Sequence, residues 1–253
     1  MLRSRIIPCL LVHNKGLVKT VQFKNPKYVG DPINAVKIFN EKEVDELIVL
    51  DIDATAEGRG PDFNLIKNLA IECRMPLCYG GGITNVEQAR KIISLGAEKI
   101  AISAAAITNV NLISEIGKAI GRQSIVIVLD IRKIGLFKNY EVYTHNGKRA
   151  TNIKLKEFIN VLNKIGIGEI MINSIDEDGK MLGFDFTLFD MIRESTSFPL
   201  TILGGAGNIE HIREAIGRYN VIGVAAGSLF IFKGKYKAVL ISYPDRQARN
   251  EIY

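Results

Sequence analysis

Short apolar runs alternate with longer amphipathic runs from one end of the chain to the other. Eight of the short runs are rich in Ile, Val or Leu and predict β-strands, because strands that are buried in a sheet have this length and composition. They cover residues 5–12, 46–51, 77–79, 99–103, 125–130, 169–173, 200–203 and 221–225.

The longer runs have helical periodicity. They predict helices over residues 32–42, 63–72, 86–95, 109–120, 154–164, 186–194 and 209–217, and a final helix after Gly227 that includes Val239. Asp31 before Pro32, Asn85 and Asn208 are the start signals expected at helix N-termini. Strict alternation of strands and helices requires parallel pairing, because parallel neighbours need a crossover of this length. Eight such units in residues 1–253 predict one domain, a (β/α)8 TIM barrel.

An internal repeat supports this closed architecture. At an offset of 123 residues the chain aligns Asp62–Phe63 with Asp185–Phe186, Gly81–Gly82 with Gly204–Gly205, Asn85–Val86–Glu87 with Asn208–Ile209–Glu210, and Ala104–Ala105 with Gly227–Ser228. The pattern predicts two similar half-barrels. The first strand of each half aligns at a slightly different offset, which makes Leu11 the symmetry mate of Asp130.

Composition narrows the class of protein. The net charge of +6, from 33 basic and 27 acidic residues, favours anionic small molecules and lacks the concentrated basic face of a nucleic-acid binder. The three cysteines, Cys9, Cys73 and Cys78, lie in apolar runs, which predicts free thiols in a reducing compartment. No apolar run has membrane-spanning length, and the apolar part of the N-terminus is too short for a signal peptide. We therefore expect a cytoplasmic protein that does not enter a membrane.

Two glycine-rich stretches, residues 79–85 and 203–208, each follow a predicted strand and open a predicted helix. Backbone N–H groups of such turns, together with a helix N-terminus, bind phosphate. The alternative is that each turn only connects a strand to a helix. With the neighbouring loops they predict two phosphate cradles, Gly81, Gly82, Ser103 and Ala104 in one and Gly205, Gly207, Gly227 and Ser228 in the other. The expected ligand is a small molecule with a phosphate near each end.

Polar side chains at the predicted strand C-termini would ring one mouth of the barrel, where barrel enzymes have their active sites. They are Asp51, Asp53, Ser103, Asp130, Asn173, Ser174 and Asp176. Asp130 is the candidate catalytic residue, since a partly desolvated carboxylate can act as a general acid or base. The alternative role for Asp130 is that of a structural acceptor for loop N–H groups.

The other mouth carries Arg5, Glu46, Lys99 and Glu169, each at the start of a strand. On the residues alone, these four charges are a salt-bridge plug.

The three histidines suggest no metal or catalytic role. His13, His145 and His211 have no partners at metal-ligand spacing, so we expect no metal site, no histidine-based triad and no cofactor. We place each histidine in a loop or on the surface. Residues 17–30 and 131–151 predict long loops that either close over an anionic substrate or are solvated without a role.

Several segments resemble the cyclase (synthase) subunit of imidazole glycerol phosphate synthase over nearly the whole chain. They are Arg5–Leu10, the Lys19 segment, Gly30–Pro32, Asp45–Leu47, Leu50–Ile52, Gly80–Ile83, Ser174–Gly179 and Ala225–Gly227. The resemblance implies a barrel that pairs with a separate glutaminase subunit. Ammonia would enter the barrel bottom and react at the top with a bis-phosphorylated ribulosyl formimino-aminoimidazole carboxamide nucleotide. The implied products are imidazole glycerol phosphate and an aminoimidazole carboxamide ribonucleotide.

The resemblance also implies residue roles. It makes Arg5, Glu46, Lys99 and Glu169 the ammonia gate, places Glu98 at the glutaminase contact, and assigns Lys19, Asp51, Asn173 and Asp176 to the substrate pocket. The family has a catalytic aspartate at the ends of the first and fifth strands, whereas this chain keeps Asp130 and has Leu11 at the other position. Ser103 replaces the usual Asn and Asn173 the usual Thr.

This combination is similar to the divergent second-copy cyclase subunits that accompany sugar amidotransferases in bacterial surface-polysaccharide pathways. The similarity implies a third, sugar-modifying protein and ammonia for an acetamidino group on a nucleotide-linked sugar. Three hypotheses stay open: a working cyclase, a divergent amidotransferase component, and a barrel without chemistry that binds a phosphorylated ligand and activates the glutaminase.

Overall fold

Eight parallel strands close into a barrel in the computed structural model, which describes residues 3–135 and 139–253. Residues 1, 2 and 136–138, within the predicted N-terminal segment and the predicted loop 131–151, lie outside the described residues. In barrel order the strands are β1 (Arg5–His13), β4 (Leu47–Asp51), β5 (Leu77–Gly80), β6 (Lys99–Ile102), β7 (Ile125–Ile134), β10 (Glu169–Ser174), β11 (Leu200–Leu203) and β12 (Gly223–Ala226). Parallel pairing of β12 with β1 closes the circle, which confirms the (β/α)8 barrel.

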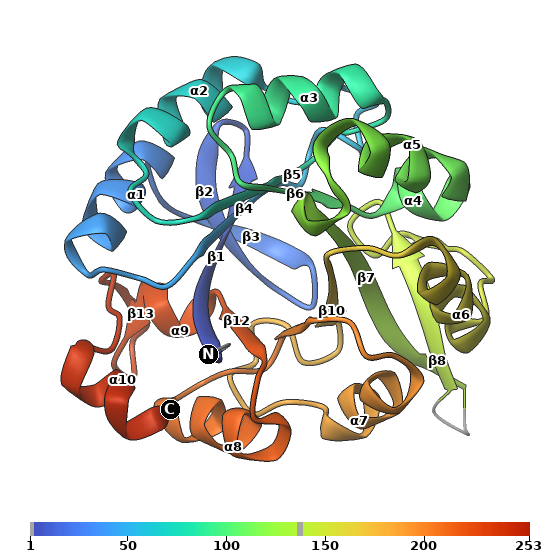
Figure 1. Cartoon of the computed structure of the whole chain (residues 1–253). Coiled ribbons are helices and arrows are strands. Elements are labelled where there is room, and N and C mark those ends of the chain that lie inside the picture. Colours follow the sequence, from blue (N-terminus) through green and yellow to red (C-terminus); the bar gives the residue numbers. More distant parts are fainter. Residues whose placement is uncertain (1–2, 136–138) are drawn as a thin grey trace.

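Helices surround the barrel on all sides (Figure 1). They are α1 (Pro32–Glu41), α2 (Phe63–Glu72), α3 (Val86–Ser94), α4 (Ala104–Thr108), α5 (Val110–Ile120), the 3-10 helix η1 (Arg122–Ser124), α6 (Leu155–Ile165), α7 (Phe186–Ser195), α8 (Ile209–Tyr219), α9 (Ser228–Ile231) and α10 (Arg246–Ile252). The predicted start signals Asp31, Asn85 and Asn208 are N-caps, and each side chain accepts a backbone N–H of the first helical turn at 2.9 Å.

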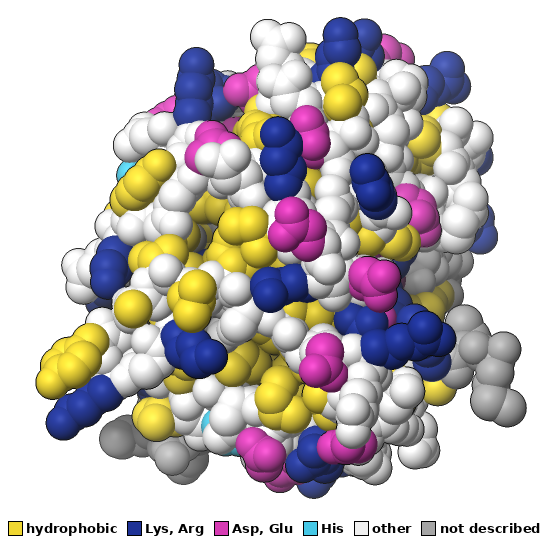
Figure 2. Space-filling model, turned by 90° about the vertical axis from the view of Figure 1, so that its left-hand side faces the viewer, with side chains coloured by type: hydrophobic (Ala, Val, Ile, Leu, Met, Phe, Trp, Pro, Cys, Tyr) yellow, Lys and Arg dark blue, Asp and Glu magenta, His cyan; other side chains and the backbone are white. Residues whose placement is uncertain are grey.

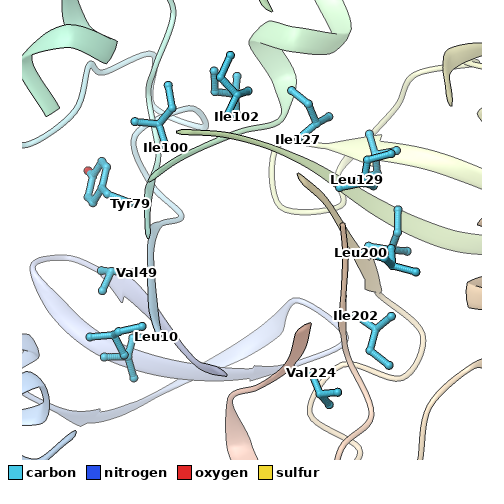
Figure 3. Packing of buried hydrophobic residues seen from close by; sticks show 14 of the residues in the cluster. Leu10, Val49, Tyr79, Ile100, Ile102, Ile127, Leu129, Leu200, Ile202 and Val224 are labelled. Atoms are coloured by element: carbon cyan, nitrogen blue, oxygen red, sulfur yellow. The ribbon is translucent and has the colours of Figure 1, made fainter. Parts of the chain in front are cut away.

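Alternation along the strands divides the core into two layers. Ten labelled side chains in Figure 3, among them Leu10 and Ile127, point outward from the barrel toward the helices. The inner layer fills the barrel and comprises Ile7, Cys9, Ile48, Cys78, Ala101, Val126, Val128, Met171, Leu203 and Ala225. Leu11 and Leu50 pack on this inner layer and are only partly buried. Because alternate residues of a strand share a face, Cys9, Leu11 and His13 of β1 point to the barrel interior.

The two segments predicted as long loops are β-hairpins, so that prediction was wrong. β2 (Gly16–Val21) and β3 (Lys24–Gly30) extend the sheet from the end of β1. β8 (Asn139–Thr144) and β9 (Arg149–Ala150) extend it from the end of β7. Both barrel strands run past the barrel rim, and their projecting ends offer unpaired backbone groups that an antiparallel strand satisfies.

The final helix was also misplaced. Val239 lies in β14 (Ala238–Val239), which pairs with β13 (Phe232–Lys233) across a turn where Gly234 has a φ of 73°. The helix after Gly227 is the short α9, and α10 follows the hairpin.

The side of the molecule drawn in Figure 2 mixes Lys and Arg with Asp and Glu among scattered hydrophobic side chains. On this face the charges form no large patch of one sign.

Candidate functional site

A cavity of about 1030 Å³ opens at the mouth formed by the carboxyl ends of the barrel strands. All eight barrel strands contribute to its lining, through Leu11, Asp51, Gly80, Ile102, Asp130, Asn173, Leu203 and Ala226. Its floor is apolar, since Cys9, Val128 and Leu203 belong to the inner core layer. A deep cavity with an apolar floor and a polar rim is the usual form of a small-molecule site.

Most residues predicted for the site line this one cavity. They are Lys19, Asp51, Gly81, Gly82, Ser103, Ala104, Asp130, Asn173, Gly205, Gly227 and Ser228. Gly207 instead lines a neighbouring hollow of about 580 Å³ beside the β13–β14 hairpin. Asp176 is not among the lining residues, because its carboxylate accepts the backbone N–H of Lys133 at 2.7 Å and so ties the end of β7 to the turn after β10. The cavity also contains His13, Arg59 and Asp178, which sequence reasoning did not place there.

Asp130 ends the barrel portion of β7 and is held by a neighbour on β10. The side-chain amide of Asn173 donates a hydrogen bond of 3.1 Å to Asp130 Oδ1. Burial raises the pKa of Asp130 to about 7, a shift that the Asn173 hydrogen bond opposes and the nearby Asp178 charge reinforces. A carboxyl group with such a pKa exchanges a proton near neutral pH, which suits it to general acid–base catalysis.

Two buried polar atoms at this mouth have no hydrogen-bond partner within the part of the chain that the structure describes. They are Asn173 Oδ1 and Ser103 Oγ, and both residues line the cavity. Because buried polar atoms are almost always paired, these two are available to a ligand.

The two glycine turns make the same close contact in each half of the barrel. Gly81 has a φ of 129°, and a Cβ added there would lie 2.6 Å from the carbonyl oxygen of Asp51. Gly204 has a φ of 93°, and an added Cβ would lie 2.5 Å from the carbonyl oxygen of Ser174. Each partner residue, like each glycine, is 123 positions from its mate. The repeat read from the sequence is therefore a repeat of backbone geometry.

The second glycine of each turn repeats the pattern. A Cβ at Gly82, where φ is 71°, would meet the Arg59 carbonyl oxygen at 2.5 Å. One at Gly205, where φ is 118°, would meet the Gly183 carbonyl oxygen at 2.0 Å. Only glycine fits these positions, because other residues rarely adopt such φ values and lack the space.

Lys19 places its side-chain amine beside Gly227, the residue that follows β12. It is 5% exposed, and its Nζ donates to the carbonyl oxygen of Cys9 at 2.5 Å. A Cβ at Gly227 would lie 2.6 Å from Lys19 Nζ, so the ammonium group touches that backbone. Burial lowers the pKa of Lys19 from its ordinary value. The β2–β3 hairpin that carries it is tied down by Asp178, which accepts the Thr20 hydroxyl at 3.0 Å.

Two carboxylates follow β4. Asp51 Oδ1 accepts the backbone N–H groups of Asp53 at 3.0 Å and Ala54 at 3.1 Å, and Arg59 lies 3.7 Å from its other oxygen. Burial raises the pKa of Asp51, although these hydrogen bonds oppose the shift. Asp53 reaches across to the end of β1, where it meets His13 Nδ1 at 2.7 Å and the backbone N–H of Asn14 at 2.7 Å.

At the opposite mouth, four charged side chains form a closed cycle of ion pairs. Arg5 contacts Glu46 and lies 2.9 Å from Glu169, and Lys99 lies 3.0 Å from each of the two carboxylates. Thr201 adds a hydroxyl hydrogen bond to Glu169. Burial alone would raise the pKa of Glu169, but Arg5 and Lys99 outweigh it and hold the pKa below its ordinary value.

Within residues 3–135 and 139–253, no group of three or more His, Cys, Asp or Glu side chains is arranged to hold a metal ion. None of the helices in these residues is both long and apolar enough to cross a bilayer.

The fold defines a (β/α)8-barrel protein, and its cavity lies at the C-terminal mouth, where barrel enzymes have their active sites. A family model described as "Histidine biosynthesis protein" matches residues 5–237, and the chain belongs to this family, to its HisF branch of imidazole glycerol phosphate synthase subunits.

Three relatives illustrate the similarity. A Leptospira interrogans protein with the provisional name imidazole glycerol phosphate synthase subunit HisF is 50% identical over 253 residues, which is 100% of both chains. A Pseudomonas aeruginosa protein provisionally named subunit hisF2 is 51% identical over 245 residues, 97% of both chains. The imidazole glycerol phosphate synthase subunit HisF of Dictyoglomus thermophilum is 38% identical over 232 residues, 92% of this chain and 91% of that one.

Proposed function

We propose that this chain is the synthase subunit of a glutamine amidotransferase complex. A glutaminase partner docks at the mouth that carries Arg5, Glu46, Lys99 and Glu169, and its ammonia passes this ring and the barrel core to the upper cavity. Relatives whose names include imidazole glycerol phosphate synthase support this proposal. So does the position of the ring, which lies at one end of the barrel while the cavity lies at the other.

The upper cavity is suited to a ligand with two phosphates. Gly81 and Gly204 mark two turns of matched geometry, and both turns border the same cavity. Backbone N–H groups of such turns bind phosphate oxygens without a charged side chain. Asn173 and Ser103 offer unpaired polar atoms between the turns. In the family reaction this ligand is the bis-phosphorylated ribulosyl formimino-aminoimidazole carboxamide nucleotide.

Leu11 is the observation that carries the more specific proposal. It lines the cavity on β1 and packs with Leu50 on the inner core layer, so this wall is apolar where the family resemblance implies a second carboxylate. Asp130 is retained on β7. We infer a divergent reaction in which the barrel supplies ammonia for amidination of a nucleotide-linked sugar during surface-polysaccharide synthesis in the cytoplasm. A third, sugar-modifying protein binds the acceptor.

Turnover of the family substrate tests this proposal. Purified wild type, Leu11→Asp and Leu11→Asn are supplied with ammonium and the ribulosyl nucleotide. We expect Leu11→Asp to exceed wild type by about 10²-fold, since a positioned acid–base group contributes about 10²- to 10⁴-fold, and Leu11→Asn to show no such gain. A wild type as fast as Leu11→Asp would instead identify a working cyclase.

The alternative is a barrel without chemistry that binds a phosphorylated ligand and activates the glutaminase. The Asp130→Asn variant distinguishes this alternative from a barrel that performs chemistry. If the barrel only activates, this variant keeps both glutaminase activation and product formation in the reconstituted complex. Loss of product with activation retained supports a chemical role for the cavity.

A further inference from the structure

The β1 wall of the cavity carries a histidine whose ring is already hydrogen-bonded to a buried carboxylate. His13 is the last residue of β1 and lines the cavity. Its Nδ1 lies 2.7 Å from Oδ1 of Asp53, a residue that is 7% exposed. The other carboxylate oxygen accepts the backbone N–H of Asn14 at 2.7 Å. Asp53 therefore holds both the ring and the backbone that carries it.

This network orients the ring. An ionised carboxylate only accepts hydrogen bonds, so Nδ1 of His13 carries a proton and donates a hydrogen bond to Asp53. In the neutral ring the other nitrogen, Nε2, is therefore the acceptor, and it lies 3.1 Å from the side-chain amide nitrogen of Asn14. Asn14 is exposed, so a ligand in the cavity can take its place. In the neutral ring, Nε2 is therefore the atom that can accept a proton from a ligand.

His13 and Asp130 stand on opposite sides of the barrel. In the strand order β1, β4, β5, β6, β7, β10, β11, β12, the strands β1 and β7 are four positions apart in a circle of eight. His13 shares the interior face of β1 with Leu11, two residues earlier. The wall that is apolar at Leu11 thus has a group able to exchange a proton at its rim.

We propose that His13, positioned by Asp53, is the proton-transfer residue of the β1 wall and acts across the cavity from Asp130. This inference rests on the function proposed above. A proton moves from an N–H or O–H of the bound ligand to Nε2, where it forms an N–H bond, and the imidazolium is stabilised by Asp53. Ammonia forms a C–N bond to the ligand, a C–O bond of the ligand breaks, and Nε2 returns the proton to the departing oxygen. The histidine ends as it began, and no bond forms between protein and ligand.

The test uses the full chain, ammonium and the ribulosyl nucleotide as probe. Wild type turns over slowly, and His13→Gln lowers its kcat by about 10²- to 10⁴-fold, with KM little changed, because glutamine can hydrogen-bond to Asp53 but cannot accept a proton. Adding Leu11→Asp to His13→Gln restores turnover, since the new carboxylate faces the same side of β1. Lys15→Gln, an exposed change in the next turn, stays within about twofold of wild type.

Two results would overturn the inference and leave the proposed function standing. In the first, His13→Gln and wild type turn over the substrate equally fast. In the second, Leu11→Asp is active and wild type shows no turnover. If Leu11→Asp is inactive as well, both the inference and the proposed chemistry of the cavity fail.

The positioning role of Asp53 has a spectroscopic readout. Nitrogen NMR of histidine-labelled protein, with the His13 signal assigned by its loss in His13→Gln, should show the Nδ1–H tautomer. Asp53→Asn should weaken that preference and lower kcat. Unchanged His13 nitrogen shifts in Asp53→Asn would refute the positioning role.

Discussion

The polar and charged side chains at the two ends of the barrel differ in how completely they are paired by ion pairs and hydrogen bonds. At the lower mouth, Arg5 and Lys99 each contact both Glu46 and Glu169, so the four charges neutralise one another. At the upper mouth, Asp130 has one side-chain hydrogen bond, and Asn173 Oδ1 has no partner within the described residues. A closed polar network stabilises its own arrangement, whereas an incomplete one costs stability until a ligand completes it. The lower network therefore satisfies its own charges, whereas the upper mouth keeps polar atoms that a ligand could pair with.

Among the variants that compare the two ends, the largest expected effect on activity comes from obstructing the barrel core between them. Ala225 is fully buried in the inner layer, and Ala225→Leu adds bulk to the barrel core through which we propose that ammonia passes. We expect product formation from glutamine in the reconstituted complex to fall by about 10-fold or more, the change that 1.4 kcal/mol of added barrier produces, while formation from added ammonium is retained. The control is Ala215→Leu, at an equally buried alanine of the outer layer. Unchanged glutamine-dependent output in Ala225→Leu would refute passage through the barrel.

Breaking the cycle of ion pairs at the lower mouth should have the largest effect on the free energy of unfolding. Glu169→Gln leaves Arg5 and Lys99 with one carboxylate, and removal of one partner from a buried ion pair typically costs about 3–5 kcal/mol. The matched control is Glu157→Gln, whose partner Lys154 is 78% exposed and whose loss should cost at most about 1 kcal/mol. Urea unfolding measures both free energies. Equal changes would show that the cycle contributes no more than a surface pair.

At the upper mouth, removal of a charge should stabilise the protein, and only at high pH. Folded Asp130 keeps its proton up to a pKa of about 7, whereas the unfolded chain releases it near 3.8. Between these values the folded state binds more protons, so its stability falls as pH rises. Asp130→Asn should therefore raise stability by a few kcal/mol at pH 8, at about 1.4 kcal/mol per pKa unit, and change little at pH 4. A pH-independent effect in thermal unfolding would contradict the shifted pKa.

The smallest expected effect concerns the rim of the cavity. Gly205→Ala forces a side chain onto a φ of 118° with the Gly183 carbonyl oxygen 2.0 Å away, and such backbone strain costs about 1–3 kcal/mol. Binding of inorganic phosphate, measured by calorimetry, should weaken as well. Gly217→Ala in α8 meets nothing within 4 Å and should gain about 0.5–1 kcal/mol. Phosphate binding that is equal in both variants would exclude the second turn from the site.

The sequence was sufficient for the barrel because periodicity and capping are local. The range predicted for the strand at 200–203 is that of β11, and Asn85 and Asn208 cap the helices that they were expected to start. The two hairpins were missed although their pairing is local. β2 follows β1 across the two-residue turn Asn14–Lys15, where both φ values are positive, and Asn at the first of these positions is a signal of such a turn.

The cavity was predictable where it depends on strand ends and unpredictable where it depends on register. Asp130 and Asn173 follow from their places at the ends of β7 and β10. The pairing of Val12 with Asp51 brings His13 beside Asp53, a contact between residues 40 positions apart. Nothing in the sequence near His13 indicates its contact with Asp53. Asp176 was expected in the pocket because it follows a strand end. Its carboxylate instead accepts a hydrogen bond from the backbone N–H of Lys133.

Lys19 makes the two halves of the duplicated barrel unequal. The side-chain nitrogen of Lys19 lies beside Gly227 in the second half. In the first half the basic side chain is that of Arg59, which lies near Asp51 and is 45% exposed. On the proposal of a ligand with a phosphate at each end, that ligand would meet an enclosed amine at one end and an exposed guanidinium at the other. The two ends of the pseudo-symmetric mouth would then be chemically distinct, and a ligand with two different ends would have one preferred orientation.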